Sequence, residues 1–87
     1  MNDAPVWLVL GASSAIARAF ARAASADGAD ILLAGRDSAD LEASAADLIA
    51  RFGRRAETVD FDALDSAGHA ALLERAKAFA EIGRAHV

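Results

Sequence analysis

Residues 6–28 read VWLVLGASSAIARAFARAASADG, and this segment decides the fold. Its apolar run, Val6 to Leu10, has the form of a strand that is buried on both faces of a parallel sheet. No helix-breaking residue occurs from Ala15 to Ala26, and Gly28 then provides a helix C-cap. The sequence therefore predicts a strand, a tight turn at Gly11 and a helix in direct succession.

Apolar spacing defines the helix faces that we expect to meet the core. On the first helix these residues are Ile16, Ala19, Phe20 and Ala23. A second apolar run, Ile31 to Ala34, predicts a second strand. Asp37 or Ser38 is the expected N-cap of a second helix, which ends at Gly53. The core stripe of that helix comprises Leu41, Ala45, Leu48, Ile49 and Phe52.

The third unit has a weaker strand followed by a clear helix. The strand is centred on Glu57 to Val59, within the segment RRAETVDF. Asp65 or Ser66 is the expected cap of a helix that extends to about Glu81. The core side of this helix comprises Leu72, Leu73, Ala76 and Phe79.

Strands and helices thus alternate as β-α-β-α-β-α, which is the pattern of an α/β fold. The connections are short enough to force parallel strands with right-handed crossovers. We interpret the chain as the N-terminal half of a Rossmann-type, doubly wound parallel sheet, truncated after its third helix. A chain of 87 residues has room for one such unit and not for a second domain.

Composition and charge exclude several classes of protein. The 9 basic and 13 acidic side chains give a net charge of −4, so no broad positive field is available to hold nucleic acid. The sequence has no cysteine, which removes disulfides and thiolate sites and suits a reducing compartment. No apolar run approaches the roughly 18–20 residues that span a bilayer. We therefore expect a cytoplasmic protein without nucleic-acid or membrane partners.

Small residues fill the turn between the first strand and the first helix. This arrangement offers unpaired backbone N–H groups and the positive end of the helix dipole to a pyrophosphate. The Ser13 and Ser14 hydroxyls add donors for phosphate oxygens. The residues assigned to this binding role are Gly11, Ser13, Ser14, Ala15 and Ile16. The alternative is that the turn is small only because the helix packs closely on the sheet.

A basic residue follows the second strand, where dinucleotide-binding folds place the side chain that meets the adenosine ribose. An acidic side chain there accepts hydrogen bonds from the ribose hydroxyls, whereas a guanidinium pairs with a 2′-phosphate. This sequence has Gly35 and Arg36 at that point, which favours NADP over NAD. The alternative is that Arg36 is a solvated loop cation, paired with Asp37.

An acidic segment, VDFDALD, follows the third strand at the same edge of the sheet. A carboxylate here can accept from the adenine amino group, and we assign this role to Asp62. The adjoining Ala63 is assigned to the cofactor site with it. Asp60 is the second choice for the carboxylate, and Asp65 is the expected helix cap. The alternative is a set of solvated turn aspartates.

These three features, in this order, resemble the short-chain dehydrogenase/reductase family, whose first half carries Gly-x-x-x-Gly-x-Gly after its first strand. Gly11 matches the first glycine, whereas Ala15 and Ala17 replace the other two, as in a variant loop of some members. Arg36 matches the basic residue of NADP-preferring members. Residues 62–65, DALD, are similar to the adenine segment Asp-x-x-Asp of the family.

The resemblance, which covers about residues 6–81, implies an NADP-dependent oxidoreductase that interconverts an alcohol and a carbonyl, and a homo-oligomeric parent protein. Hydride transfer in that family depends on a tyrosine, a lysine and a serine. This chain has no tyrosine, and its single lysine, Lys77, is expected to be a solvated charge on the third helix. Neither His69 nor His86 is placed as a base, and no metal-ligand spacing occurs. We therefore expect a cofactor-binding portion without catalytic residues, inactive on its own.

Two rival functions would use the same half-sheet. A non-catalytic NADP-binding sensor or regulatory module would keep Gly11 and Arg36 but lack the tyrosine and lysine even at full length. A methyltransferase that binds an adenosyl cofactor usually has an acidic residue near Gly35, and the sequence has none there. The oxidoreductase is therefore our first hypothesis and the sensor our second.

The last residues, Ile82 to Val87, correspond to the codons ATC GGA AGA GCA CAC GTC, a widely used sequencing-adapter sequence that continues in frame into the stop codon TGA. We interpret residues 1–81 as a partial dinucleotide-binding domain and residues 82–87 as a non-native read-through tail. The alternative is an ordinary helix end. Amplification from intact genomic DNA without adapters should give a different sequence after Glu81. Recovery of the same codons would contradict the interpretation.

Overall fold

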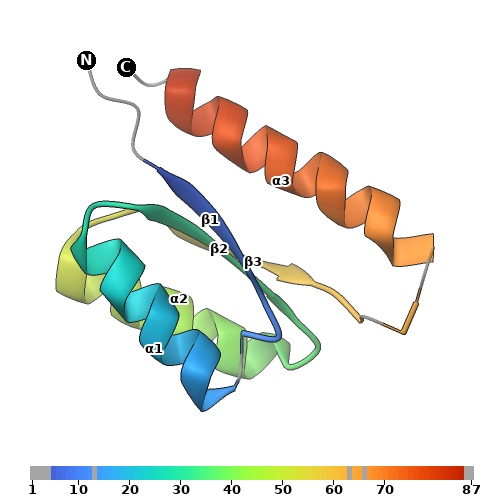
Figure 1. The fold of residues 1–87 in the computed structure, drawn as a ribbon, viewed down its shortest axis with the longest axis horizontal. Coiled ribbons are helices and arrows are strands. Elements are labelled where there is room, and N and C mark those ends of the chain that lie inside the picture. The colour runs from blue at the N-terminus through green and yellow to red at the C-terminus, as the bar shows by residue number, and fades with distance from the viewer. Residues whose placement is uncertain (1–4, 13, 63, 66, 86–87) are drawn as a thin grey trace.

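Strands and helices alternate along the chain, as the sequence predicts (Figure 1). The computed structural model describes residues 5–12, 14–62, 64–65 and 67–85, with side chains through Glu81. The elements are β1 (Val6–Leu10), α1 (Ala15–Ala26), β2 (Asp30–Gly35), α2 (Ser38–Phe52), β3 (Ala56–Asp60) and α3 (Ala67–Ala85).

The strands form a parallel sheet in the order β1-β2-β3, so β2 lies between the other two. Trp7 of β1 aligns with Ile31 of β2, and Leu33 of β2 aligns with Thr58 of β3. The helices α1 and α2 cover one face of the sheet, whereas α3 lies across the other (Figure 1). This topology confirms the truncated Rossmann-type half-sheet that the sequence predicts.

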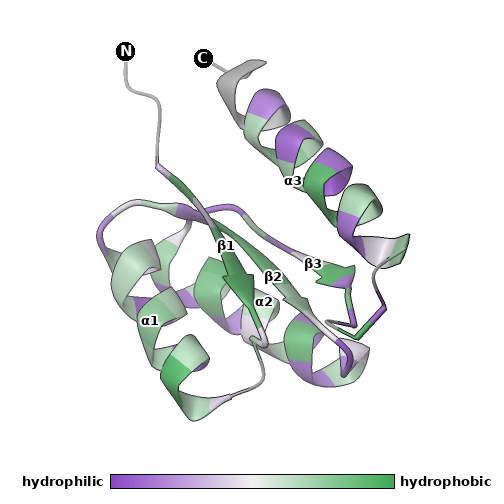
Figure 2. Cartoon of the chain, turned by 45° about the vertical axis from the view of Figure 1, so that its right-hand side comes forward, coloured by the Kyte–Doolittle hydropathy of each residue, from purple (hydrophilic) through white to green (hydrophobic). Residues whose placement is uncertain are grey.

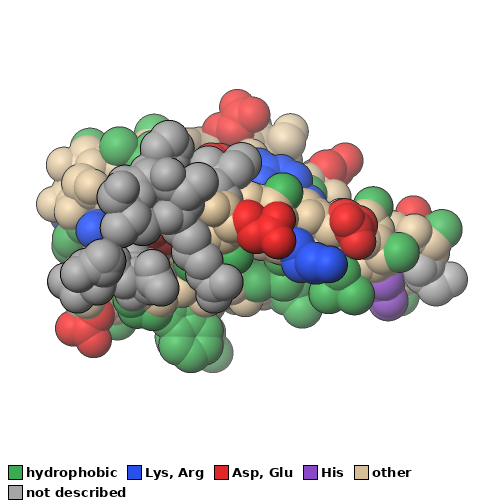
Figure 3. Space-filling model, turned by 90° about the horizontal axis from the view of Figure 1, so that it is seen from above, with side chains coloured by type: hydrophobic (Ala, Val, Ile, Leu, Met, Phe, Trp, Pro, Cys, Tyr) green, Lys and Arg blue, Asp and Glu red, His purple; other side chains and the backbone are tan. Residues whose placement is uncertain are grey.

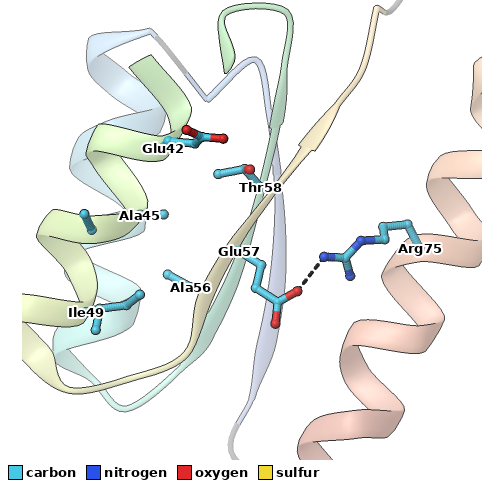
Figure 4. A pocket seen from close by; sticks show the side chains of 8 residues that line it. Glu42, Ala45, Ile49, Ala56, Glu57, Thr58 and Arg75 are labelled. Carbon is cyan, nitrogen blue, oxygen red and sulfur yellow. Dashed lines mark hydrogen bonds and ion pairs between the residues drawn. The ribbon is translucent and has the colours of Figure 1, made fainter. Parts of the chain in front are cut away.

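The core lies between the sheet and the helix pair α1 and α2. Every residue of β2 is buried, because this strand has a neighbour on each edge and helices over both faces. Leu41, Ala45 and Leu48 of α2 enter the core as predicted, and Phe52 packs at its margin. The prediction for Ile49 is wrong. Its side chain is half exposed because it lies in a groove beside Ala56, near the edge of β3 that pairs with no other strand among the described residues (Figure 4).

The small residues of α1 face the core, contrary to the sequence prediction. Its buried and half-buried residues are Ala17, Ala21, Ala24 and Ser25. All of the residues predicted to face the core are exposed: Ile16 (85%), Ala19, Phe20 (42%) and Ala23. Alanine side chains allow the helix to approach the sheet closely, so the larger side chains are displaced to its outer face. The sequence prediction, which placed the face with the larger apolar side chains in the core, therefore selected the wrong face of α1.

β1 is less buried than its apolar sequence predicts. Val9 is buried, whereas Trp7 is 47% exposed and Leu10 is 54% exposed. The reason is the strand order, which leaves one edge of β1 without a neighbouring strand among the described residues. The Trp7 ring packs edge-on against Phe20 of α1, with the ring centroids 5.1 Å apart and the planes at 84°. Figure 2 shows that β1 and much of α1 consist of hydrophobic residues.

The ends of the first two helices lie at or next to the predicted capping residues. Asp37 is the N-cap of α2, and its carboxylate accepts a hydrogen bond of 3.1 Å from the Asp40 N–H. Gly53 ends α2 with a φ of 67°, a left-handed conformation that favours glycine. The C-cap of α1 is Asp27, and Gly28 follows it, with its N–H bonded to the Ser25 carbonyl. The predicted glycine cap of α2 is confirmed, whereas α1 ends near Gly28 but is capped one residue earlier.

The third helix agrees with its prediction in part. The Asp65 carboxylate accepts a hydrogen bond of 3.1 Å from the N–H of Ala67, the first residue of α3, although Asp65 lies two residues before the helix begins. The other candidate cap, Ser66, lies outside the described residues. The helix continues to Ala85 rather than ending near Glu81. No helix in the described part of the chain has both the length and the apolar character needed to cross a membrane.

The inner side of α3 is narrower than predicted. Leu72 and Phe79 are buried and Ala76 is half buried, as expected. Leu73 is 61% exposed, so its assignment to the core is wrong. Among the described residues, α3 is the only helix on this face of the sheet. A side chain that does not point directly at the sheet therefore meets solvent and not a neighbouring helix. The surface seen from above mixes acidic and basic side chains (Figure 3).

Ionic and aromatic contacts attach α3 to the sheet. The Arg55 guanidinium lies 3.7 Å from the centroid of the buried Phe79 ring and donates to the Phe79 carbonyl oxygen. The buried Asp30 carboxylate lies 3.5 Å from the same guanidinium. Arg75 of α3 pairs with Glu57 of β3 at 2.5 Å (Figure 4). The helix is therefore anchored through its middle and C-terminal turns.

Truncation of Phe79 tests this anchor. Phe79→Ala should lower the free energy of unfolding by about 3 kcal/mol, because it removes a fully buried ring and its contact with Arg55. Leu73→Ala on the same helix should change it by less than about 0.5 kcal/mol. Urea denaturation measures both values, and hydrogen exchange should show the loss of protection concentrated in α3. Equal effects of the two substitutions would contradict the assigned orientation of the helix.

Candidate functional site

A cavity of about 600 Å³ lies where the carboxyl ends of the three described strands meet. In a parallel sheet the segments that follow each strand converge on the same edge, which is where ligands of α/β proteins bind. The residues that line the cavity are Leu10, Gly11, Gly35, Arg36, Asp37, Phe61, Asp62, Leu64 and His69. This set includes Gly11, Arg36 and Asp62, which the sequence assigned to a cofactor from separate segments.

The turn from β1 into α1 has the geometry of an anion-binding loop. Gly11 has a φ of 61°, and its carbonyl accepts a hydrogen bond of 3.1 Å from the Ser14 N–H. The Ser14 hydroxyl oxygen accepts from the Ala17 N–H at 3.1 Å, which makes Ser14 the N-cap of α1. Helix geometry then leaves the N–H groups of Ala15 and Ile16 without an intrahelical acceptor. Ser13, assigned to the same loop, lies outside the described residues.

The alanines that replace two glycines of the family motif introduce no backbone strain. Ala15 is the first residue of α1, and the described residues with a positive φ are all glycines. Ala17 is half buried and packs against the core. Its methyl group therefore contributes to packing between helix and sheet, while the helix N-terminus still offers its N–H groups.

Arg36 and Asp62 meet across the rim of the cavity. Their closest charged atoms, Arg36 Nη1 and Asp62 Oδ2, are 3.9 Å apart, with 72% and 42% of the side chains exposed. The other carboxylate oxygen of Asp62 accepts a hydrogen bond of 3.0 Å from the Leu64 N–H. The ion-pair partner of Arg36 is therefore Asp62 and not Asp37, whose carboxylate caps α2. Ala63 lies outside the described residues.

The remaining aspartates of the acidic segment lie away from the cavity. Asp60 is the exposed last residue of β3 and is absent from the cavity lining. Asp65 is also absent from the cavity lining, and its carboxylate accepts a hydrogen bond from the Ala67 N–H at the start of α3. Of the three candidates, Asp62 is thus the carboxylate that the fold places at the cavity.

An aromatic wall at the cavity was missed by the sequence analysis. The rings of Phe61 and His69 lie with their centroids 5.5 Å apart and their planes tilted by 40°, and both line the cavity. The Phe61 N–H also donates to the Gly35 carbonyl at 2.8 Å, which continues the pairing of β2 and β3 into the site. An aromatic residue between two aspartates was the available signal for Phe61. Nothing local in the sequence pointed to His69, because the fold of α3 brings it there.

The described residues fit the adenosine and diphosphate portions of a dinucleotide. The cavity volume falls within the range of about 300–1,000 Å³ that is common for small-ligand sites. Aromatic and aliphatic side chains can contact a base, Arg36 can pair with a phosphate, and the N-terminus of α1 can bind a diphosphate. Within the described residues, no group of three or more His, Cys, Asp or Glu side chains is placed to hold a metal ion.

Comparison with known proteins identifies the family. Residues 5–84 match the family model described as short chain dehydrogenase. The chain belongs to the short-chain dehydrogenase family. This confirms the resemblance found in the sequence. A search of proteins with curated descriptions gave no match.

Solved structures of this family share the fold. A short-chain dehydrogenase from Sphingobium yanoikuyae in complex with NADPH is 35% identical, with a TM-score of 0.77 over 82% of this chain and 28% of that one. L-Sorbose reductase from Gluconobacter frateurii, complexed with NADPH and L-sorbose, is 30% identical, with a TM-score of 0.81 over 87% and 29%. An NADPH-bound short chain oxidoreductase from Pseudomonas aeruginosa PAO1 with an atypical catalytic center is 31% identical, with a TM-score of 0.77 over 84% and 29%. The chain therefore spans less than a third of each of these proteins.

The conformation of Gly11 gives a test of the binding loop. An added Cβ would meet no atom within 4 Å, so Gly11→Ala should destabilise the fold through backbone strain alone, by about 1–2 kcal/mol. Gly68→Ala, in α3, should stabilise it by about 0.5 kcal/mol, because its Cβ makes only ordinary contacts and the unfolded chain loses freedom. Urea denaturation measures both. A neutral Gly11→Ala variant would show that the turn does not require a left-handed residue.

Proposed function

We propose that the parent protein is an NADP-preferring oxidoreductase that interconverts an alcohol and a carbonyl, and that residues 1–81 are part of its cofactor-binding domain. The observation that carries this proposal is the convergence of Arg36, Asp62 and Gly11, the first residue of the turn that leads into α1, on one cavity. Family membership supports an oxidoreductase, and NADPH is present in three of the similar structures. A guanidinium at the end of β2 supports the choice of NADP over NAD.

The residues of this chain bind and orient the cofactor in this proposal. The N–H groups at the start of α1 and the Ser14 hydroxyl bind the diphosphate, with Gly11 giving the turn its shape. Arg36 pairs with the 2′-phosphate, and Asp62 accepts from the adenine amino group. When bound, NADPH would supply the hydride for reduction, and NADP⁺ would accept it in the reverse reaction. The chain contains no tyrosine, and we propose that the 87 residues alone are inactive and that residues 82–87 are not native.

The rest of the parent protein completes the proposal. It would supply the catalytic tyrosine and lysine, the binding site for a small carbonyl or alcohol substrate, and the contacts of a homo-oligomer. We place the protein in the cytoplasm, since a sequence without cysteine suits a reducing compartment. Sequencing the gene past Glu81 distinguishes the two leading hypotheses. A Tyr-x-x-x-Lys segment supports the enzyme, and its absence from the full gene supports the non-catalytic NADP-binding sensor.

Removal of the Arg36 guanidinium tests the cofactor preference. In the complete gene product, Arg36→Ala should weaken NADPH binding roughly ten- to a hundredfold, as expected for lost hydrogen bonds to a charged group, while NADH binding changes less than about twofold. Isothermal titration calorimetry measures both dissociation constants. The matched control is Arg51→Ala, which removes an exposed arginine that pairs with Asp47 on α2, away from the cavity. Equal losses for NADPH and NADH, or unchanged NADPH binding, would remove the role of Arg36.

A further inference from the structure

The Arg36 guanidinium, which would bind the 2′-phosphate in the proposed function, already forms an ion pair with Asp62. The two side chains come from the segments after β2 and β3 and bridge the rim of the cavity. At 3.9 Å the charged atoms are too far apart for a hydrogen bond. Asp62 is the fixed partner, because its second oxygen accepts from the Leu64 N–H, whereas Arg36 is the more exposed of the two. A ligand at the rim therefore meets an arginine that already has a weak partner.

Electrostatics favour the 2′-phosphate over Asp62 as the partner of Arg36, but Asp62 continues to weaken the binding of the phosphate. An exposed ion pair contributes at most about 1 kcal/mol, whereas a phosphate carries more charge and can accept two parallel N–H bonds from the guanidinium. The Asp62 carboxylate stays close after the exchange, and its negative charge opposes that of the phosphate. Asp37 adds a second negative charge to the cavity lining, so one cation stands against two anions there. The strength of the preference for NADP over NAD therefore does not depend on Arg36 alone.

We propose that Asp62 is a specificity-determining residue. The 2′-phosphate must replace Asp62 as the partner of Arg36, and this competition limits the preference for nucleotides that carry the 2′-phosphate. This inference rests on the proposed function, since it requires nucleotide binding at this cavity. The adenine contact of Asp62 is common to nucleotides with and without the 2′-phosphate. A change in that contact therefore cancels when the two affinities are compared as a ratio.

The test uses Asp62→Asn in the complete gene product, with 2′,5′-ADP and 5′-AMP as probes. These nucleotides differ only in the 2′-phosphate. Asparagine keeps an oxygen acceptor for the Leu64 N–H and removes the charge. The ratio of the 5′-AMP to the 2′,5′-ADP dissociation constant should rise about three- to tenfold at low ionic strength, and the rise should shrink in high salt. An unchanged or lower ratio would overturn the proposal.

Two controls separate the ion pair from other effects of charge. Asp37→Asn removes one negative charge from the same cavity, and asparagine caps a helix as well as aspartate does, so this variant should raise the ratio clearly less. In the Arg36→Ala background, Asp62→Asn should raise the ratio clearly less than it does in the wild type, because the competition for Arg36 is gone and only the direct repulsion between Asp62 and the phosphate is relieved. An equal rise in Asp37→Asn, or a full rise without Arg36, would overturn the proposal.

The same titrations distinguish failure of this inference from failure of the proposed function. If the wild-type protein binds neither probe and neither NADPH nor NADH, the proposed function fails and the inference falls with it. If the wild type binds and prefers 2′,5′-ADP while Asp62→Asn keeps the wild-type ratio, the proposed function stands and only the role of Asp62 is lost.

Discussion

The parallel pairing of β2 with both β1 and β3 is the constraint on which the rest of the structure depends. It buries every residue of β2 and directs the carboxyl ends of the strands to one edge. Gly11, Arg36 and Asp62 are far apart in the sequence, and each follows a different strand. Because the pairing is parallel, these residues line one cavity. An antiparallel neighbour would have directed one of these segments to the opposite end of the sheet.

The cavity combines a rigid part with an adaptable part. The rigid part includes the left-handed Gly11 and the hydrogen bond from the Phe61 N–H to the Gly35 carbonyl. Its rim is made of long, exposed side chains, of which Arg36 and Asp62 are the charged pair. In the proposed function, the rigid part would recognise what all dinucleotides share, and the side chains would discriminate between them. Ala15 and Ala17 leave the architecture intact because both lie in α1, where no positive φ is required.

The sequence predicted the order and most boundaries of the elements because local signals determine them. An apolar run bounded by Gly11, the Asp37 cap and the Gly53 stop each depend on a few neighbouring residues. Burial was predicted less well, since it depends on which face meets a neighbour. The exposed Ile16 and Leu73 show that apolar character alone does not decide this.

At the site, sequence order and spacing were enough to find Arg36 and Asp62, since both follow strands of the same sheet. Their mutual ion pair could not be foreseen, because it depends on the relative positions of two loops. His69 was set aside as a residue at the start of a helix, and its place in the cavity wall follows from how α3 crosses the sheet. Contacts between segments thus account for most of what the sequence did not reveal.

The way α3 is attached has a mechanical consequence for the cavity. His69 lies in the first turn of this helix, whereas Phe79, clasped by Arg55, lies ten residues later, about 15 Å away along the helix axis. The ionic and aromatic contacts that attach α3 to the sheet, Arg75 with Glu57 and Arg55 with Phe79, both lie beyond its first turns. A substitution that tilts the helix at these contacts would therefore also move His69, and with it one wall of the cavity.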